Sequence, residues 1–521
     1  MKYVFGLLML VMAIVPLKRA LFIFQQNRYE TGRYWAWIKE NAKRLMHENG
    51  FYLLMCVLTV LLLTVWNSVI ANSIEIVLMV FTTVLLFFTE KHNTYIKPLV
   101  YTARVKRQIV VMSILYIGMT FLLLHFDLCG LYYVSAYFMP WIFIWPMHWI
   151  TEPIEASVRK KFLMEAKHIL QEDTRLIRIG ITGSFGKTTT KNIMQAILSE
   201  QFNSLMTPAS YNTPMGITRT IREMLKPIHE VFVCEMGADH VGDIRELMEF
   251  VEPTIGVVTS VGPQHLNTFG SQENITKEKM EIIEMLPKDG FGVMNYDNEF
   301  IRNWKVKNQV ETATYGIHNK DVDYRAEEIE YSPHGSCFVV VHGEERIPFE
   351  TKLLGELNIL NILSAVAVAR HLGVEWSVIQ RATKQMKQVE HRLELKKING
   401  FRFIDDAFNA NPTGSAMALE VLSGMPGKRI IVTPGMIDLG EKQTEINRRF
   451  GTMMKDKADE VILVGEIQTR PIYEGLKESG YDMDHVQVVK TEKDAFAYIW
   501  ANATVADTIL LENDLPDAFN H

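Results

Sequence analysis

The chain has 521 residues and a formal net charge of −6 at pH 7. This length exceeds one ordinary domain and predicts about three or four. The mild acidity argues against nucleic acid as the main partner. The four cysteines are spread without the spacing of a metal site or of a disulfide framework.

Residues 1–150 are rich in large apolar side chains and look suited to lipid. Four stretches are long enough, or nearly so, to cross a bilayer, and a shorter one precedes them. They are residues 51–70, 74–88, 109–126 and 129–150, and residues 4–16. Buried helices of a soluble protein are the alternative interpretation, but runs in close succession with Trp and Tyr near their ends favour membrane helices. Residues 4–16 also resemble a signal peptide, yet no small-residue cleavage site follows them, so we expect an uncleaved helix.

Lysine and arginine are concentrated in three of the segments that connect or follow these stretches. They are Lys18, Arg19, Arg28, Arg33, Lys39, Lys43, Arg44, Lys97, Arg104, Lys106, Arg107, Arg159, Lys160 and Lys161. The two remaining connections carry neither residue. Because basic loops stay in the cytoplasm, we expect about five transmembrane helices within residues 1–163, with the N-terminus outside. The protein is then a multi-pass plasma-membrane protein whose other residues face the cytoplasm and its ATP.

A glycine-rich turn, TGSFGKTTT at residues 182–190, lies between a β-branched run and a helix-forming stretch. A strand that ends in such a turn and opens a helix directs backbone N–H groups at one point, at the positive end of the helix dipole. Lys187 can then contact a β- or γ-phosphate, and the Thr188 hydroxyl can reach Mg²⁺. The full P-loop pattern requires glycine where Ile181 stands, so the match is to the shorter GxxGKT form. A plain turn is the alternative, but the flanking strand and helix favour phosphate binding.

From residue 177 onward, apolar β-branched runs alternate with helical patterns, which predicts a mostly parallel sheet covered by helices. The expected strands are 177–181, 231–234, 255–259 and 291–294, and the expected helices are 189–200, 243–251 and 276–285. A β-rich stretch follows at 324–353, then helices at 358–372 and 377–387. A second alternating block has strands at 401–405, 430–433, 461–464 and 508–511. The predicted fold is an α-helical membrane domain (1–163), a P-loop-type α/β domain (164–388) and a Rossmann-like α/β domain (389–521).

Polar side chains stand at two expected strand ends, where open α/β sheets bind their ligands. Glu235 ends the strand in VFVCEMG and is well placed to hold Mg²⁺ beside a phosphate. A helix-capping or solvated glutamate is the alternative. His265 follows the next strand, and spacing alone leaves a structural and a metal-binding role open. Lys279 lies beside acidic residues on an expected helix, where a solvated face is the default.

The order of these motifs resembles that of the Mur ligases, and within them the MurF type, which adds D-alanyl-D-alanine in peptidoglycan synthesis. The motifs are TGSFGKTTT, SYNTPMGIT, VCEMGADHVGDI, TSVGPQHLNTFGS, ITKEKMEII, GELNILNILSAVAVA, EHRLE and IDDAFNANP, within residues 177–440. The resemblance implies an ATP-dependent ligase. A substrate carboxylate attacks ATP to give an acyl phosphate, and an amino-acid or peptide amine then displaces phosphate. The resemblance also implies ATP and two Mg²⁺ ions as cofactors.

The resemblance also assigns roles to matched positions. For the nucleotide it implies Gly183, Ser184, Gly186, Lys187, Thr188, Thr189, Asn212, Asn361, Arg392 and Asp406. For the metal ions it implies Thr188, Glu235, His265 and Lys279, with Lys279 carbamylated. The implied catalytic set is Lys187, Glu235, His265 and Lys279.

Two departures from the family bear on the substrate. A membrane domain stands where soluble Mur ligases carry a domain that binds the UDP of their substrate. The Lys-Gly-Ser run near the MurF C-terminus is replaced by ILLENDLPDAFN. We therefore expect a membrane-anchored ligase of cell-envelope biosynthesis that acts on a lipid-linked or membrane-proximal carboxylate acceptor.

Three alternatives are kept beside this expectation. The first is the housekeeping MurF reaction on a UDP-linked peptide, with a membrane tether added. The second is a membrane scaffold that only senses ATP, but the presence of Glu235, His265 and Lys279 argues against it. The third is an ATP-driven transporter, which the small number of membrane stretches and the lack of a recognisable charge constellation within them disfavour.

Overall fold

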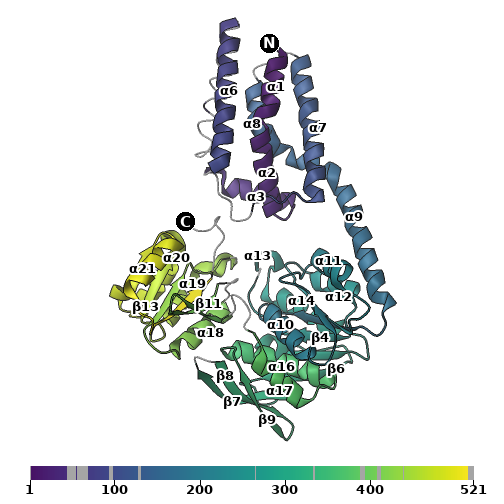
Figure 1. Ribbon diagram of the computed structural model, residues 1–521, viewed down its shortest axis with the longest axis vertical. Coiled ribbons are helices and arrows are strands. Elements are labelled where there is room, and N and C mark those ends of the chain that lie inside the picture. The colour runs from purple at the N-terminus through teal and green to yellow at the C-terminus, as the bar shows by residue number, and fades with distance from the viewer. Residues whose placement is uncertain are drawn as a thin grey trace. The chain divides into compact units, whose positions relative to one another are not determined.

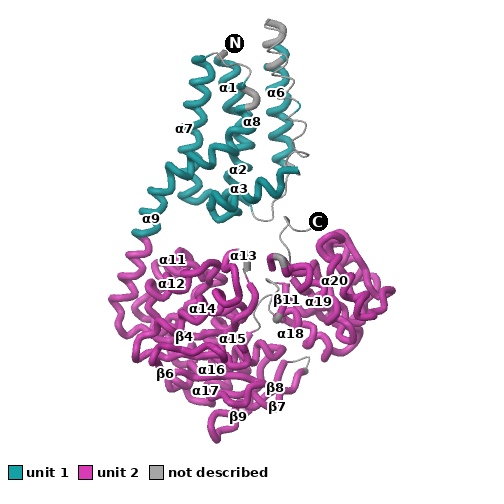
Figure 2. Tube along the Cα trace, turned by 180° about the vertical axis from the view of Figure 1, so that it is seen from behind, with its two compact units in different colours: residues 1–161 teal, residues 162–521 magenta. Residues whose placement is uncertain are grey.

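The computed structural model describes residues 2–43, Leu54 and residues 69–92, 98–126, 131–264, 266–332, 335–387, 393–407, 412–437 and 439–513. Its contacts divide the chain into two compact units, which Figure 2 colours separately. Unit 1 comprises residues 1–161, and unit 2 comprises residues 162–521.

Unit 1 consists of helices with large apolar side chains (Figure 1). They are α1 (Lys2–Met12), α2 (Ile14–Gln26), α3 (Thr31–Glu40), α6 (Val69–His92), α7 (Ala103–His125), α8 (Tyr132–Ile142) and α9 (Ile144–Glu172), which continues into unit 2. One cluster of buried side chains includes Met79 and Tyr116, and a second includes Phe24 and Met112. Within the described residues, Tyr3–Gln26 and Ala103–His125 are long and apolar enough to cross a membrane.

The apolar stretches expected from the sequence correspond to these helices with shifted ends. Residues 74–88 lie within α6, and residues 109–126 overlap most of α7. Residues 4–16 belong to α1 and α2, so the helical run is longer than expected and reaches Gln26. Residues 51–70 lie almost entirely outside the described part of the chain. The number of membrane crossings therefore stays a prediction.

The single span expected at residues 129–150 is divided at Phe143 into α8 and α9. Pro146 lies in the first turn of α9, where it has no N–H to donate to the carbonyl of Ile142. A proline is tolerated in the first turn of a helix, because the N–H groups there have no acceptor within that helix. The same proline cannot continue the hydrogen-bond ladder of a preceding helix. This explains why one apolar run forms two helices.

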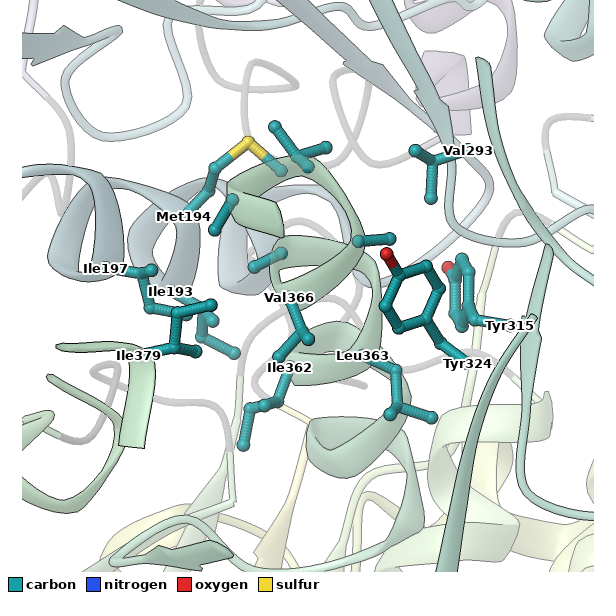
Figure 3. Close-up of a cluster of buried hydrophobic side chains, with 14 of the residues drawn as sticks. Ile193, Met194, Ile197, Val293, Tyr315, Tyr324, Ile362, Leu363, Val366 and Ile379 are labelled. Carbon is teal, nitrogen blue, oxygen red and sulfur yellow. The ribbon is translucent and has the colours of Figure 1, made fainter. Parts of the chain in front are cut away.

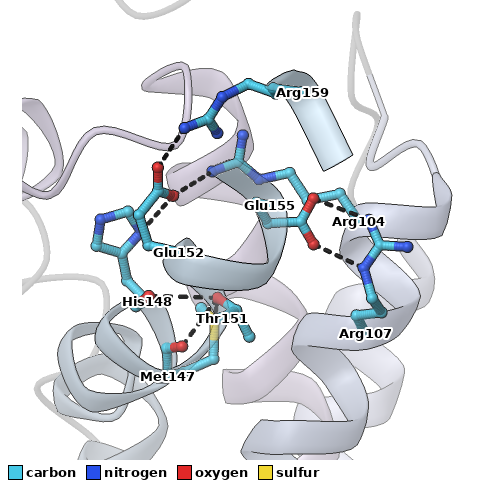
Figure 4. A network of polar contacts seen from close by, with 8 residues as sticks. All are labelled: Arg104, Arg107, Met147, His148, Thr151, Glu152, Glu155 and Arg159. Atoms are coloured by element: carbon cyan, nitrogen blue, oxygen red, sulfur yellow. Dashed lines mark hydrogen bonds and ion pairs between the residues drawn. The ribbon is translucent and has the colours of Figure 1, made fainter. Parts of the chain in front are cut away.

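Ion pairs join α7 to α9 within unit 1 (Figure 4). The guanidinium of Arg107 holds the buried carboxylate of Glu155 through two hydrogen bonds of 2.7 and 2.8 Å. Glu152 accepts from Arg104 at 3.4 Å and from Arg159 at 2.5 Å. Several of the basic residues that predicted the topology are thus paired with carboxylates.

Unit 2 contains two β-sheets with helices packed against them (Figure 1). The first sheet has β1 (Ile177–Thr182), β2 (Ser204–Met206), β3 (Val231–Glu235), β4 (Ile255–Val258), β5 (Phe291–Asn295), β6 (Glu311–Gly316), β7 (Tyr324–Ser332), β8 (Gly335–His342) and β9 (Glu345–Thr351). Its helices are α10 (Lys187–Leu198), α11 (Pro214–Met224), α12 (Asp243–Val251), α13 (Leu266–Phe269), α14 (Gln272–Glu284), α15 (Glu299–Arg302), α16 (Glu356–His371) and α17 (Trp376–Gln385).

The second sheet has β10 (Glu394–Ile398), β11 (Phe401–Asp406), β12 (Arg429–Thr433), β13 (Glu460–Val464), β14 (Val486–Val489) and β15 (Thr508–Glu512). Its helices are α18 (Pro412–Ser423), α19 (Gln443–Met453), α20 (Glu466–Glu478) and α21 (Glu492–Asn502).

Both sheets are mixed rather than wholly parallel. The nine strands of the first follow the order β2-β3-β1-β4-β5-β6-β7-β8-β9, and those from β2 to β7 are parallel. The last pairs, β7 with β8 and β8 with β9, are antiparallel. The second sheet has the order β10-β11-β15-β12-β13-β14, with only β10 antiparallel.

The two faces of the first sheet bury different cores. Alternate residues of a strand point to opposite faces, so Val233 packs with α10, α16 and α17 while Phe232 packs with α12 and α14. Figure 3 shows the first of these cores, where side chains of α10, such as Met194, and of α16, such as Val366, gather with Tyr324 and Tyr315, whose rings lie side by side. The packing fixes α10 against the sheet and so positions the turn that precedes it.

Candidate functional site

The glycine-rich turn joins β1 to α10, as the sequence predicts. Gly183 has a φ of +155° and Gly186, the residue before the helix, a φ of +85°. The N–H groups in the first turn of a helix have no acceptor inside the helix, so those of Thr188 and Thr189 point outward from the positive end of its dipole. The Nζ of Lys187 folds back and donates to the carbonyls of Gly183 and Ser184. The loop thus gathers positive charge and N–H groups at the carboxyl end of β1.

Residues that follow β4 hold the turn in place. Ser184 donates its N–H to the carbonyl of Ser260 at 2.9 Å, and its hydroxyl exchanges hydrogen bonds of 3.0 Å with Gly262. The N–H of Phe185 donates to the hydroxyl of Ser260 at 2.8 Å. A Cβ on Gly183 would lie 2.1 Å from the hydroxyl oxygen of Thr259. Only glycine therefore fits at this point of the turn.

Glu235 ends the neighbouring strand β3 and is only 1% exposed. Its Oε1 accepts from the hydroxyl of Thr188 and from Nδ2 of Asn212, each at 3.1 Å. Its Oε2 accepts from Nζ of Lys191 at 3.0 Å. Burial alone would raise the pKa of Glu235, but the charges of Lys191 and Lys187 and the hydrogen bonds outweigh it and lower that pKa. The structure therefore keeps an ionised carboxylate beside the start of α10.

Lys279 is buried on α14, not on the solvated face that its acidic neighbours suggest. Its Nζ lies 3.4 Å from the carbonyl of Ala238, in the segment that follows β3. Burial, followed by the charge of Lys187, lowers the pKa of Lys279 to about 7. Its neighbour Glu278 accepts from the N–H groups of Gly242 and Ile244 and holds the start of α12.

These residues fit ATP with Mg²⁺. A carboxylate and a hydroxyl are hard oxygen donors of the kind that Mg²⁺ prefers. Asn361, on α16, accepts from the hydroxyl of Thr190 at 3.0 Å, while its buried Nδ2 has no hydrogen-bond partner among the described residues. That amide is a donor at the edge of the turn. Within the same part of the chain, no three His, Cys, Asp or Glu side chains gather into a closed metal site. Mg²⁺ commonly takes one or two protein carboxylates beside phosphate and water.

The structure therefore brings together ten of the residues expected from the sequence, of which Gly183, Ser184, Gly186 and Thr189 belong to the turn and the start of α10 and six more contribute their side chains. These six are Lys187, Thr188, Asn212, Glu235, Lys279 and Asn361. Asp406 lies on β11 of the other sheet, where its Oδ1 accepts from the N–H of Leu393 at 3.1 Å. His265 and Arg392 lie outside the described residues, so their roles stay predictions.

Sequence reasoning missed several residues that shape this site. Lys191 pairs with Glu235, Thr207 accepts from the backbone N–H of Glu235 at 3.1 Å, and Ser260 holds the turn. For Lys191, one feature of the sequence could have indicated burial. This lysine lies four residues after Lys187, on the face of α10 that also carries buried apolar side chains.

Substituting Gly186 by Ala is expected to weaken ATP binding and to cost about 1–2 kcal/mol of stability. The added Cβ would lie 2.7 Å from Oδ1 of Asn361, and the positive φ is unfavourable for alanine. The measurements are the KM for ATP and the denaturant midpoint. Gly343→Ala is the matched control, because Gly343 also has a positive φ but nothing within 4 Å of its Cβ position. An unchanged KM in Gly186→Ala would contradict this account of the turn.

Comparison with known proteins agrees with the geometry. The family model of the Mur ligase middle domain matches residues 181–369, and that of the Mur ligase glutamate ligase domain matches residues 391–512. The UDP-N-acetylmuramoyl-tripeptide–D-alanyl-D-alanine ligase of Bacillus subtilis is 31% identical over 352 residues, which cover 67% of this chain and 75% of that protein. The Escherichia coli enzyme of the same name is 31% identical, over 55% of this chain and 64% of its own length.

Solved structures show the same fold. MurF from Acinetobacter baumannii superposes with a TM-score of 0.62 at 25% identity, over 68% of this chain and 77% of that one. MurF from Thermotoga maritima in complex with ADP gives a TM-score of 0.62 at 24% identity, over 68% of this chain and 80% of that one. These likenesses and the site geometry lead to one conclusion. The chain belongs to the Mur ligase family of ATP-dependent ligases that form amide bonds.

Proposed function

We propose that this chain catalyses a MurF-type reaction, in which ATP activates the terminal carboxylate of a UDP-MurNAc tripeptide and D-alanyl-D-alanine supplies the amine. The observation that carries the proposal is the set of Lys187, Thr188 and Glu235 at the carboxyl ends of two adjacent parallel strands. The names of the Bacillus subtilis and Escherichia coli relatives supply the substrates.

The side chains support this chemistry in distinct ways. ATP supplies the phosphoryl group, and Mg²⁺ offsets the charge that builds up as two anions meet. Lys187 and the first turn of α10 would bind phosphate oxygens, and Thr188 with Glu235 would hold a metal ion. His265 is the expected further metal ligand. Asn212 donates to Oε1 of Glu235, the same oxygen that accepts from Thr188, and Asn361 would offer its Nδ2 amide to the nucleotide.

Carbamylation of Lys279 forms part of the proposal. CO₂ reacts only with a neutral amine, and it converts the amine into an anionic carbamate with release of a proton. The buried position lowers the pKa of Lys279 to about 7, so a large fraction is neutral at physiological pH. The carbamate would give this buried position a negative charge that can bind a second metal ion.

Lys279→Ala is therefore expected to lower turnover by about 100-fold or more, and added acetate or formate is expected to restore part of it. A small carboxylate can enter the space left by the side chain and replace the carbamate oxygens. Lys279→Arg keeps a cation but cannot be carbamylated, and it should be as inactive as the alanine variant. An active Lys279→Arg enzyme would refute carbamylation.

The acceptor can be identified by comparing ADP release with each candidate acceptor. The expectation drawn from the sequence placed a lipid-linked precursor first, whereas the names of the relatives favour the UDP-linked peptide. Purified enzyme would be given each acceptor with D-alanyl-D-alanine, and ADP release would be followed. ADP release with the UDP-linked peptide supports the proposal, and release with the lipid-linked one alone would replace it. ATP binding without ADP release under any condition would favour the scaffold.

We also propose that unit 1 anchors the enzyme in the plasma membrane, with unit 2 in the cytoplasm. Ile114, Ile117 and Phe121 recur at helical spacing on α7 and are all exposed. Exposing an apolar helix face to water is unfavourable, whereas the same face is compatible with lipid. If the acceptor is lipid-linked, an anchor beside it would raise its effective concentration. Membrane fractionation tests the anchor: we expect the protein in the detergent-soluble fraction, and release by salt or carbonate would contradict it.

A further inference from the structure

Among the described residues near the candidate site, Lys191 has the most deeply buried charged side chain. It lies one turn after Lys187 on α10, and its side chain is 0% exposed. Taking an ammonium group out of water is costly unless its charge and donors are matched. A lysine at this position therefore needs specific partners.

The partners of Lys191 come from two other segments. Its Nζ donates to Oε2 of Glu235 at 3.0 Å and to the carbonyl of Ala209. Ala209 has a φ of +43°, which turns its backbone within the segment between β2 and α11. The same segment contributes Asn212, whose carbonyl accepts from Gly237 at 2.9 Å. Lys191 thus ties α10, the end of β3 and this segment together.

The two carboxylate oxygens of Glu235 accept hydrogen bonds from different residues. Oε2 faces Lys191, whereas Oε1 faces the hydroxyl of Thr188 and the amide of Asn212. A carboxylate held through one oxygen has lost most of its rotational freedom. Its other oxygen is then fixed beside Thr188 before any ligand arrives. Groups that orient a metal ligand in this way commonly affect metal affinity by about 10- to 100-fold.

We propose that Lys191 is a positioning residue that fixes Glu235 so that Oε1 stays directed at the Mg²⁺ position beside Thr188. Lys191 acts through Glu235 and through the carbonyl of Ala209, not on the substrate. The inference rests on the proposed function, because a metal ligand needs orientation only where a metal binds. A purely structural ion pair would stabilise the fold without affecting the response to Mg²⁺.

The test is Lys191→Met, which keeps the length of the side chain and removes its charge. The readout is the Mg²⁺ concentration that gives half of the ADP-induced rise in Tm, measured on the full-length protein. We expect this concentration to rise by about 10- to 100-fold. The Mg²⁺ dependence of turnover should shift in parallel, with a smaller change in kcat at saturating Mg²⁺. Ile193→Val is the matched control, because Ile193 is buried on the same helix and has no polar group.

If Lys191→Met does not fold, the double variant Lys191→Met/Glu235→Gln takes its place. Both charges of the buried pair are removed in the double variant, so neither is left unpaired. If Lys191 acts through Glu235, the double variant and Glu235→Gln should need the same Mg²⁺ concentration. An unchanged response in Lys191→Met, or a further tenfold loss in the double variant, would overturn the inference. If the wild-type protein shows no Mg²⁺-dependent binding of ADP, the proposed function itself fails.

Discussion

Replacing Lys187 by Ala is expected to lower kcat by about 10²- to 10³-fold, with little change in the stability of unit 2. Transfer of a phosphoryl group to a carboxylate brings anions together, so a fixed cation at the phosphates stabilises the transition state more than the ground state. Lys187 is only partly buried, and its Nζ contacts carbonyls of its own turn. Its loss therefore removes positive charge from the site without opening the core.

The measurement for Lys187→Ala is steady-state ADP release at saturating ATP and Mg²⁺, together with thermal unfolding. Lys226→Ala is the control, because Lys226 is exposed after α11. That variant should match the wild type in both assays. Turnover within a fewfold of wild type in Lys187→Ala would contradict the assignment of the turn as a phosphate site.

Replacing Glu235 by Ala is expected to abolish turnover and also to destabilise unit 2 by about 3–5 kcal/mol. The metal ligand is lost, and the buried ammonium group of Lys191 is left without its carboxylate. Denaturant unfolding measures the second effect separately from the first. Glu223→Ala is the control, because its ion pair with Arg219 is exposed and contributes little to stability.

Adding Lys191→Met to Glu235→Ala separates the two effects further. The double variant is expected to regain most of the lost stability, since no unpaired charge remains, but no activity. A double variant as unstable as Glu235→Ala would show that the loss of stability is not caused by the unpaired, buried charge of Lys191.

The parts of the site that lie on regular elements could be predicted from the sequence. Strand β1 is a short β-branched run that ends directly before Gly183, and β3 is an apolar run that ends in Glu235. Both signals are local, and parallel strands bring their carboxyl ends to one edge. The expected helix at 243–251 coincides with α12 for the same reason, because its apolar side chains recur with helical spacing.

The parts that depend on partners distant in sequence could not be predicted. The acidic neighbours of Lys279 suggested a solvated face, but Glu278 accepts hydrogen bonds from the N–H groups at the start of α12. Lys191 was overlooked because its carboxylate partner lies 44 residues further along the chain. The β-rich stretch expected at residues 324–353 contains β7, β8 and β9, but their antiparallel pairing was not predicted. That pairing and the edge strand β10 depend on sheet contacts that hydropathy does not encode. In unit 1, the proline-determined break at Phe143 was missed because the run stays apolar across it.

The central claim is that the enzyme activates a carboxylate with ATP, and transfer of an oxygen isotope tests it most directly. The terminal carboxylate of the acceptor peptide is labelled with ¹⁸O, and the phosphate released with ATP and D-alanyl-D-alanine is examined by mass spectrometry. Attack of the carboxylate on the γ-phosphate, followed by displacement by the amine, leaves one carboxylate oxygen in the phosphate. We predict one ¹⁸O in each phosphate released, only when acceptor and amine are both present. Unlabelled phosphate from the same mixture would contradict the account.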